Sequence, residues 1–300
     1  MARLGVCRIT FFVERHMDTT EKGRRDFLKS LALGAAGAAM LTPQTVNAAE
    51  GGTLQVWSCG GLAEAMMPAH EAYQQHSGVK IVYTGAFAAA LGKSLLTGGG
   101  QTEVFAGRVL ALAQNLRKAG KMVNFRPLCF TSYVIAVPKG NPAKINDIED
   151  LTRPGVRVSM ARDASAPGGQ AVMGILKAAD ITPKVLANVP EQGSCVQRSV
   201  ESVAEGKADA MIVERRITRM TRFADRLDLV EIPERFFPAG PLTFTVGMMA
   251  NASDPAKAAA YMDWITSAQG QAYFEKAGFI PAISPKGMEL VEKLGVKDVA

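Results

Sequence analysis

Short apolar segments alternate with amphipathic segments along most of this chain, and this alternation restricts the possible folds more than any other feature. The pattern predicts a buried strand at 54–57, a turn at Gly60 and Gly61, and a helix from Leu62 to Gln75. A strand at 79–83 and a helix at 86–96 repeat the order. Such alternation predicts an α/β fold in which helices cover a largely parallel sheet.

The same reasoning assigns the later segments. Further strands are expected at 103–106, 132–137, 156–160, 210–213 and 244–249, and further helices at 109–119, 169–179, 199–205, 255–266 and 269–277. A chain of 300 residues is long enough for two domains of ordinary size.

The amino terminus is predicted to be an export signal. Arg24 and Arg25 precede Phe-Leu-Lys and a weakly apolar run at 31–41, which resembles a twin-arginine signal and makes the twin-arginine translocase the expected partner during export. The run is too short to span a bilayer, which takes about 20 residues. Small residues near Ala49 predict cleavage there, so residues 1–49 are interpreted as a signal peptide of a periplasmic protein. Translation starts at either Met1 or Met17.

Net charge argues against a nucleic-acid partner. The whole chain has 34 Lys and Arg against 28 Asp and Glu, but residues 1–49 hold seven basic and four acidic residues. The remainder has 27 basic and 24 acidic residues, which is a small and scattered excess.

Three cysteines follow the predicted cleavage site: Cys59, Cys129 and Cys195. They contain no CxxC pair, so a redox dithiol is not indicated. The thiols could be buried, two of them could form a disulfide, or all three could bind a soft metal ion.

Five segments in the same order as in a known family resemble the periplasmic molybdate- and tungstate-binding proteins, which belong to the type II solute-binding proteins of ABC transporters. They cover residues 78–80, 103–106, 137–157, 206–213 and 269–279. The resemblance implies two α/β domains with a hinge and an inter-domain cleft, built from residues 50–129 plus 237–300 and from residues 130–236. It also implies a monomer that binds a small inorganic ligand, delivers it to an ABC transporter permease and needs no cofactor.

The resemblance also suggests which residues bind the ligand. The family's positions fall on Gly61, on Ala86 and Phe87, on Gly168, on Val196 and on Glu214. Neighbouring Ser58, Cys59, Gly60 and Cys195 complete the expected ligand-binding set. Ligands of open α/β sheets bind beyond the carboxyl ends of the strands, which agrees with this placement.

The chain departs from the family at these positions. Gly61, Ala86 and Phe87 lack the serine hydroxyls of molybdate binders, and Glu214 replaces the usual tyrosine. A carboxylate repels an oxyanion unless it is protonated or neutralised by Arg215 or Arg216. Two ligand classes therefore stay open: an oxyanion such as molybdate or tungstate, or a soft metal or metalloid held by Cys59, Cys129 and Cys195. An enzyme is not indicated, because no histidine is expected near the cleft to serve a cysteine nucleophile as base.

Overall fold

The computed structural model describes residues 51–162, 168–190, 192–193 and 195–298, and residues 49–300 form one compact unit. The predicted signal peptide and its twin arginines lie outside the described residues. Within these ranges, no helix combines the length and apolar character needed to cross a bilayer.

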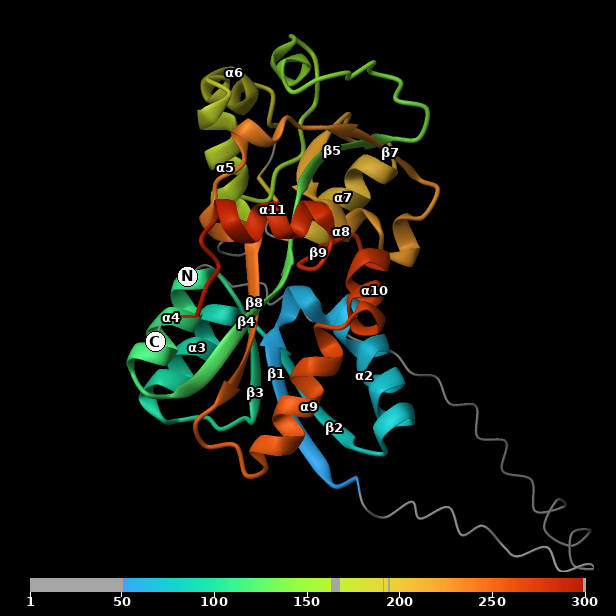
Figure 1. Cartoon of the computed structure of the whole chain (residues 1–300). Coiled ribbons are helices and arrows are strands. Elements are labelled where there is room, and N and C mark those ends of the chain that lie inside the picture. Colours follow the sequence, from blue (N-terminus) through green and yellow to red (C-terminus); the bar gives the residue numbers. More distant parts are fainter. Residues whose placement is uncertain (1–50, 163–167, 191, 194, 299–300) are drawn as a thin grey trace, which may run out of the picture. The chain divides into compact units, whose positions relative to one another are not determined.

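Two sheets organise the fold (Figure 1). The six-stranded sheet has the order β2-β1-β3-β8-β4-β9, with β1 (Thr53–Cys59), β2 (Lys80–Ala86), β3 (Val104–Arg108), β4 (Met122–Phe130), β8 (Thr243–Met249) and β9 (Ile280–Pro281). The three-stranded sheet has the order β6-β5-β7, with β5 (Tyr133–Pro138), β6 (Met211–Glu214) and β7 (Leu227–Glu231).

Helices cover both faces of each sheet. One face of the larger sheet packs against α2 (Ala63–Ser77), α9 (Pro255–Ile265) and α10 (Ala268–Lys276), and the other against α3 (Ala88–Thr97) and α4 (Leu110–Lys118). The smaller sheet lies between α5 (Gly168–Ala178) and α6 (Thr182–Ala187) on one face and α7 (Val196–Ala204) and α8 (Arg215–Thr218) on the other. The remaining elements are α11 (Pro285–Lys293) and the 3-10 helices η1 (Gly60–Leu62), η2 (Glu149–Thr152), η3 (Thr221–Phe223), η4 (Glu234–Phe236) and η5 (Gly240–Leu242).

Strand β5 is apolar on both of its faces. Ile135 and Val137 belong to the core beneath α5, whereas Val134 and Ala136 belong to the core beneath α7. Because successive side chains point to opposite faces, a strand buried on both faces needs a continuous apolar run. Full burial of a large aliphatic side chain contributes about 1.5–3 kcal/mol, so this short run holds both helix layers in place.

The α/β prediction is confirmed, but the expectation of a largely parallel sheet is wrong. Strands β1, β2 and β3 are parallel, whereas β8 runs antiparallel to both β3 and β4, and all pairs in the smaller sheet are antiparallel. The reason is the path of the chain. It leaves the larger sheet at the end of β4 and returns through β8, so these strands run in opposite directions next to each other.

Several elements were not predicted. Strand β4 is one of them, because Pro127 argues against a central strand. The strand accommodates the proline because its register shifts between Pro127 and Cys129. A bulge at this point removes the need for the missing N–H. Strands β7 and β9 and helices α6 and α11 were also not predicted. The strand expected at 156–160 is reduced to isolated bridges at Val158 and Met160.

Two adjacent chain segments join the sheets. Phe130 ends β4 and Tyr133 begins β5, while β8 begins at Thr243. The N–H of Thr131 donates to the carbonyl of Leu242 at 2.9 Å, so both crossings lie side by side. This is compatible with the predicted domain boundaries at 129/130 and 236/237, which stay a prediction.

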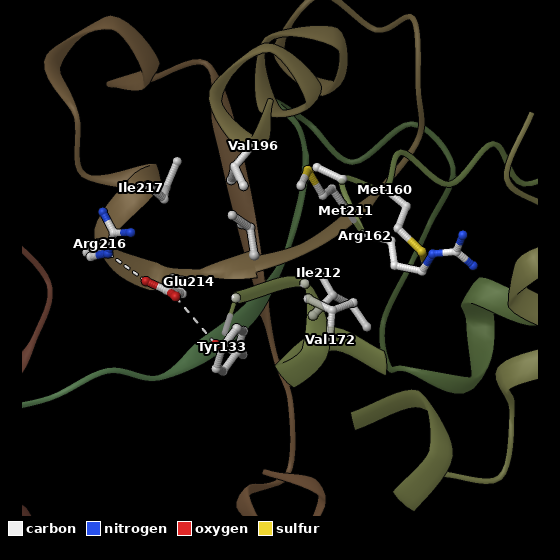
Figure 2. A pocket seen from close by; sticks show the side chains of 14 residues that line it. Tyr133, Met160, Arg162, Val172, Val196, Met211, Ile212, Glu214, Arg216 and Ile217 are labelled. Atoms are coloured by element: carbon white, nitrogen blue, oxygen red, sulfur yellow. Dashed lines mark hydrogen bonds and ion pairs between the residues drawn. The ribbon is translucent and has the colours of Figure 1, made fainter. Parts of the chain in front are cut away.

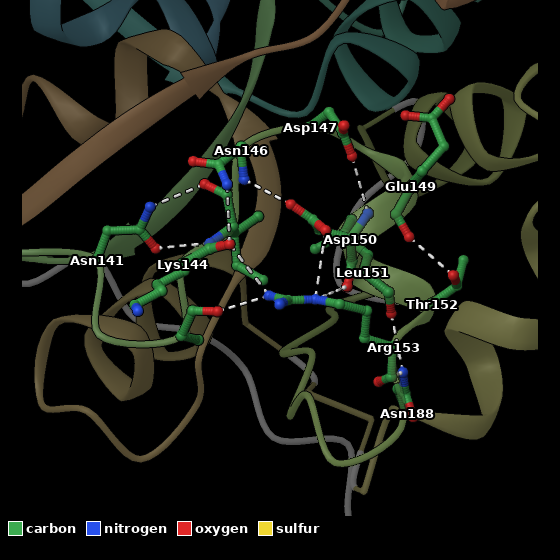
Figure 3. Close-up of polar contacts among 12 residues, drawn as sticks. Asn141, Lys144, Asn146, Asp147, Glu149, Asp150, Leu151, Thr152, Arg153 and Asn188 are labelled. Carbon is green, nitrogen blue, oxygen red and sulfur yellow. Dashed lines mark hydrogen bonds and ion pairs between the residues drawn. The ribbon is translucent and has the colours of Figure 1, made fainter.

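The segment that contributed most to the family resemblance has a structural role (Figure 3). The Asn141 side chain accepts from the N–H of Ile145 and donates to its carbonyl, at 3.0 and 2.8 Å. Asp150 accepts from the N–H of Asn146, and Arg153 donates to the carbonyls of Ala143 and Lys144. The conformation of this loop is therefore set by its own side chains.

Candidate functional site

Strand ends from both sheets meet at one place in the molecule. The register pairs Cys59 with Ala86 and Ser58 with Ala106, so the carboxyl ends of β1, β2 and β3 lie at one edge of the larger sheet. Arg108 is the last residue of β3. In the smaller sheet Tyr133 at the start of β5 pairs with Glu214 at the end of β6. Ion pairs between the two sheets connect these ends.

The centre of the site is a buried carboxylate between two guanidinium groups. Arg108 Nη2 lies 2.6 Å from Glu214 Oε1, and Arg216 Nε lies 2.5 Å from Glu214 Oε2. The side chains of Arg108, Glu214 and Arg216 are 5%, 6% and 13% exposed. The Tyr133 hydroxyl accepts from Arg108 at 3.2 Å. It donates to Glu214 at 3.4 Å (Figure 2). Arg216 also reaches Glu64 of α2, with Nη1 and Oε2 3.6 Å apart.

The charges of this cluster determine its protonation. Burial alone would raise the pKa of Glu214, but Arg216 and Arg108 outweigh it and lower that pKa from 4.5 to about 2. Burial likewise opposes the charge on both arginines, yet Glu214 raises the pKa of each. Burial, followed by the charge of Glu214, raises the pKa of Tyr133. At neutral pH the site therefore contains two cations, an ionised Glu214 and a neutral phenol.

A cavity of about 40 Å³ adjoins this cluster in the smaller sheet's half. Its lining includes Glu214 and Arg216, Gly168 at the start of α5, and Val196 at the start of α7. At the amino-terminal cap position of α7, the Cys195 side chain makes no capping hydrogen bond. The first N–H groups of a helix have no intrahelical partners and carry a partial positive charge, which favours anions. Arg162 also lines the cavity, on the side away from Glu214 and Arg216 (Figure 2).

Several predicted ligand-binding residues lie together here. Gly168, Val196 and Glu214 line the same cavity. Gly61 is connected to it through Arg216, because a Cβ built on Gly61 would lie 3.1 Å from Arg216 Nη2. Whether these residues contact the ligand stays a prediction.

The other predicted residues differ in how readily they could contact a ligand in this cavity. The Ser58 hydroxyl donates to the Cys59 carbonyl and lies 2.6 Å from the Tyr83 hydroxyl, so it is already engaged. Ala86 ends β2 beside Gly60, with a Cβ built on Gly60 3.5 Å from the Ala86 carbonyl oxygen. Phe87 is 67% exposed at the start of α3. It therefore lies at the surface and not in the buried cluster.

The structure does not support the metal site predicted for the three thiols. Among the described residues, no three His, Cys, Asp or Glu side chains lie close enough to hold a metal ion. Cys59 ends β1 and Cys129 lies in β4, and β3 and β8 separate these strands. Cys59 and Cys129 are free thiols, so no disulfide links them. Cys195 lies elsewhere, at the start of α7.

Burial also makes the first two thiols poor ligands. It raises the pKa of Cys59 and, more strongly, that of Cys129. Only the thiolate binds metals well. The reading of Cys59 and Cys129 as small buried hydrophobic residues therefore fits the structure.

The partner of Glu214 was predicted only in part. Arg216 does neutralise it, but Arg215 pairs with the exposed Glu231. Sequence reasoning missed Arg108 and Tyr133. A signal for Arg108 was available, since it is the one charged residue at the end of a short apolar strand.

Comparisons with known proteins relate this chain to solute-binding proteins. A family model described as bacterial extracellular solute-binding protein matches residues 54–280. The chain is 32% identical over 187 residues to the molybdate-binding protein ModA of Mycobacterium tuberculosis, which covers 61% of this chain and 67% of that protein. It is 25% identical over 174 residues to a sulfate-binding protein of Synechococcus elongatus, covering 53% of this chain and 49% of that protein.

A solved structure extends the comparison to the fold. The periplasmic molybdate-binding protein of Azotobacter vinelandii superposes with a TM-score of 0.63 at 16% identity, over 76% of this chain and 98% of that chain. This likeness confirms the predicted periplasmic-binding-protein fold.

Proposed function

We propose that this chain, which belongs to the bacterial extracellular solute-binding protein family, binds a small oxyanion beside Arg216 and delivers it to an ABC transporter permease. The family binds solutes and is not enzymatic. The observation that carries the proposal is the meeting of the buried Arg216 guanidinium with the amino termini of α5 and α7 around one cavity, beside the ion pair of Glu214 with Arg108.

The chemistry of the donors supports an oxyanion over a metal ion. Guanidinium groups donate paired N–H bonds whose geometry fits oxyanions. Backbone N–H groups at Gly168 and Val196 are donors as well, and none of these groups coordinates a cation. The metal or metalloid alternative depended on three convergent thiols, and these do not converge.

The relatives support the same ligand class. One binds molybdate and another sulfate, and both ligands are tetrahedral dianions. The relatives support the oxyanion class only, and the ion that this chain prefers within the class is left to measurement.

A thermal-shift series on the full chain tests the proposal. Molybdate, tungstate, sulfate and phosphate are compared with Zn²⁺ and Cu⁺, because a ligand that binds only the folded state raises its stability. We expect at least one oxyanion to raise the melting temperature and neither metal to do so.

Two adjacent arginines of α8 provide a matched pair of variants. Arg216→Gln removes the guanidinium at the cavity and should abolish the oxyanion shift. Arg215→Gln removes one that pairs with the exposed Glu231 and should keep it. A shift that survives in the first variant, or that only metals produce, refutes the proposal.

A further inference from the structure

A buried carboxylate lies in the site proposed for the oxyanion. Glu214 lines the cavity and is ionised, and both of its oxygens accept from guanidinium groups. A ligand bound beside Arg216 lies within a few ångströms of this negative charge. It competes with Glu214 for the same cations.

The net charge around Glu214 is the sum over the charged and titratable groups that surround it. Arg108 approaches from β3 and Arg216 from α8, and Glu64 of α2 lies 3.6 Å from Arg216. Tyr133 of β5 and Cys59 of β1 stay neutral, because burial raises the pKa of both. The two guanidiniums and the two carboxylates therefore cancel.

The helices supply the remaining charge. α5 has 11 residues and α7 has nine, and both begin at the cavity. Each amino terminus acts as roughly half a positive charge, which gives about one unit for the pair. Arg162 also lines the cavity, but its side chain is exposed, so solvent screens its charge.

We infer that Glu214 makes this site selective for singly charged oxyanions over dianions. This inference rests on the proposed function and adds the charge class of the ligand. A dianion leaves one charge uncompensated in a buried site, whereas a monoanion is balanced by the two helix termini. Specificity then comes from a repulsive element built against the competing ligand.

Pairs of ions with the same shape and different charge test the inference. Perrhenate and tungstate are tetrahedral ions of closely similar size with one and two negative charges, and perchlorate and sulfate form a second pair. Calorimetric titration of the full chain gives the affinity of each ion. We expect perrhenate to bind more tightly than tungstate, and perchlorate more tightly than sulfate.

Glu214→Gln removes the negative charge and keeps the shape of the side chain. The ratio of perrhenate affinity to tungstate affinity should fall by about tenfold to a hundredfold, the effect of one unit charge a few ångströms from the ligand. Glu231→Gln is the matched control, because it removes an exposed carboxylate paired with Arg215 in the same half of the protein. It should leave the ratio unchanged.

The outcomes separate the two proposals. If both kinds of ion bind and the wild-type chain prefers the dianions, the charge inference is wrong and the oxyanion function stands. This arm needs no variant, so it holds even if Glu214→Gln fails to fold. An unchanged ratio in a folded Glu214→Gln also overturns the inference. If no oxyanion of either charge binds, both proposals fall.

Discussion

Replacing Arg108 with methionine should destabilise the protein far more than loss of an ordinary surface charge. The substitution keeps the apolar stem of the side chain and removes the guanidinium. Glu214 would then keep Arg216 as its one remaining guanidinium partner among the contacts described above. The carboxylate is 6% exposed, so water cannot replace the lost cation.

The pKa of Glu214 gives the size of the effect. Its fall from 4.5 to about 2 corresponds to about 3 kcal/mol of stabilisation of the ionised form, at about 1.4 kcal/mol per unit. Breaking a buried pair from one side costs about 3–5 kcal/mol. Because Arg108 and Arg216 share the stabilisation, we expect a loss of about 2–4 kcal/mol, or at least about 4 °C in Tm for a protein of this size.

The sign of the pH dependence follows from the same shift. The folded-state pKa lies below the unfolded value, so the stabilisation is fully present above about pH 4.5 and is lost as the pH falls toward 2. Removing Arg108 should raise the folded pKa and shrink this acid-dependent part of the stability.

Urea unfolding at pH 7 and at pH 3.5 measures both quantities. Lys139→Met is the control, since Lys139 and Asp228 form a solvent-exposed pair and such pairs contribute little to stability. The double variant Arg108→Met with Glu214→Met should recover most of the loss, because no uncompensated charge remains. A loss no greater than that of the control would refute the reasoning.

Three further experiments test other parts of the structure. His70 is buried, which lowers its pKa from 6.5 to about 4, so the wild type should lose stability as the pH falls from 6.5 to 4; His70→Gln should remove that slope in urea unfolding. Gly61→Ala should weaken oxyanion binding severalfold in calorimetry, because its Cβ would lie 3.1 Å from a buried guanidinium, whereas Gly60→Ala meets only an ordinary contact at 3.5 Å and should keep the affinity. Joint replacement of Cys59 and Cys129 by serine should leave oxyanion affinity unchanged, since neither thiol ionises; a large loss would restore a ligand role for the thiols.

The sequence by itself determined the local structure of this protein. Apolar runs of the right length predicted β1, β5 and β8, and helical spacing predicted α2 and α9, because side-chain periodicity follows directly from backbone geometry. The family resemblance predicted ligand positions at the glycine turn after the first strand and at Glu214, and these stay predictions.

Tertiary structure alone decided strand direction and the partners of the buried charges. β4 and β8 are more than a hundred residues apart in sequence, and no local pattern encodes that they run antiparallel side by side. Arg108 meets Glu214 across 106 positions for the same reason. The stabilisation of a buried ion pair depends on distance and on exclusion of water, and both exist only once the two sheets have come together.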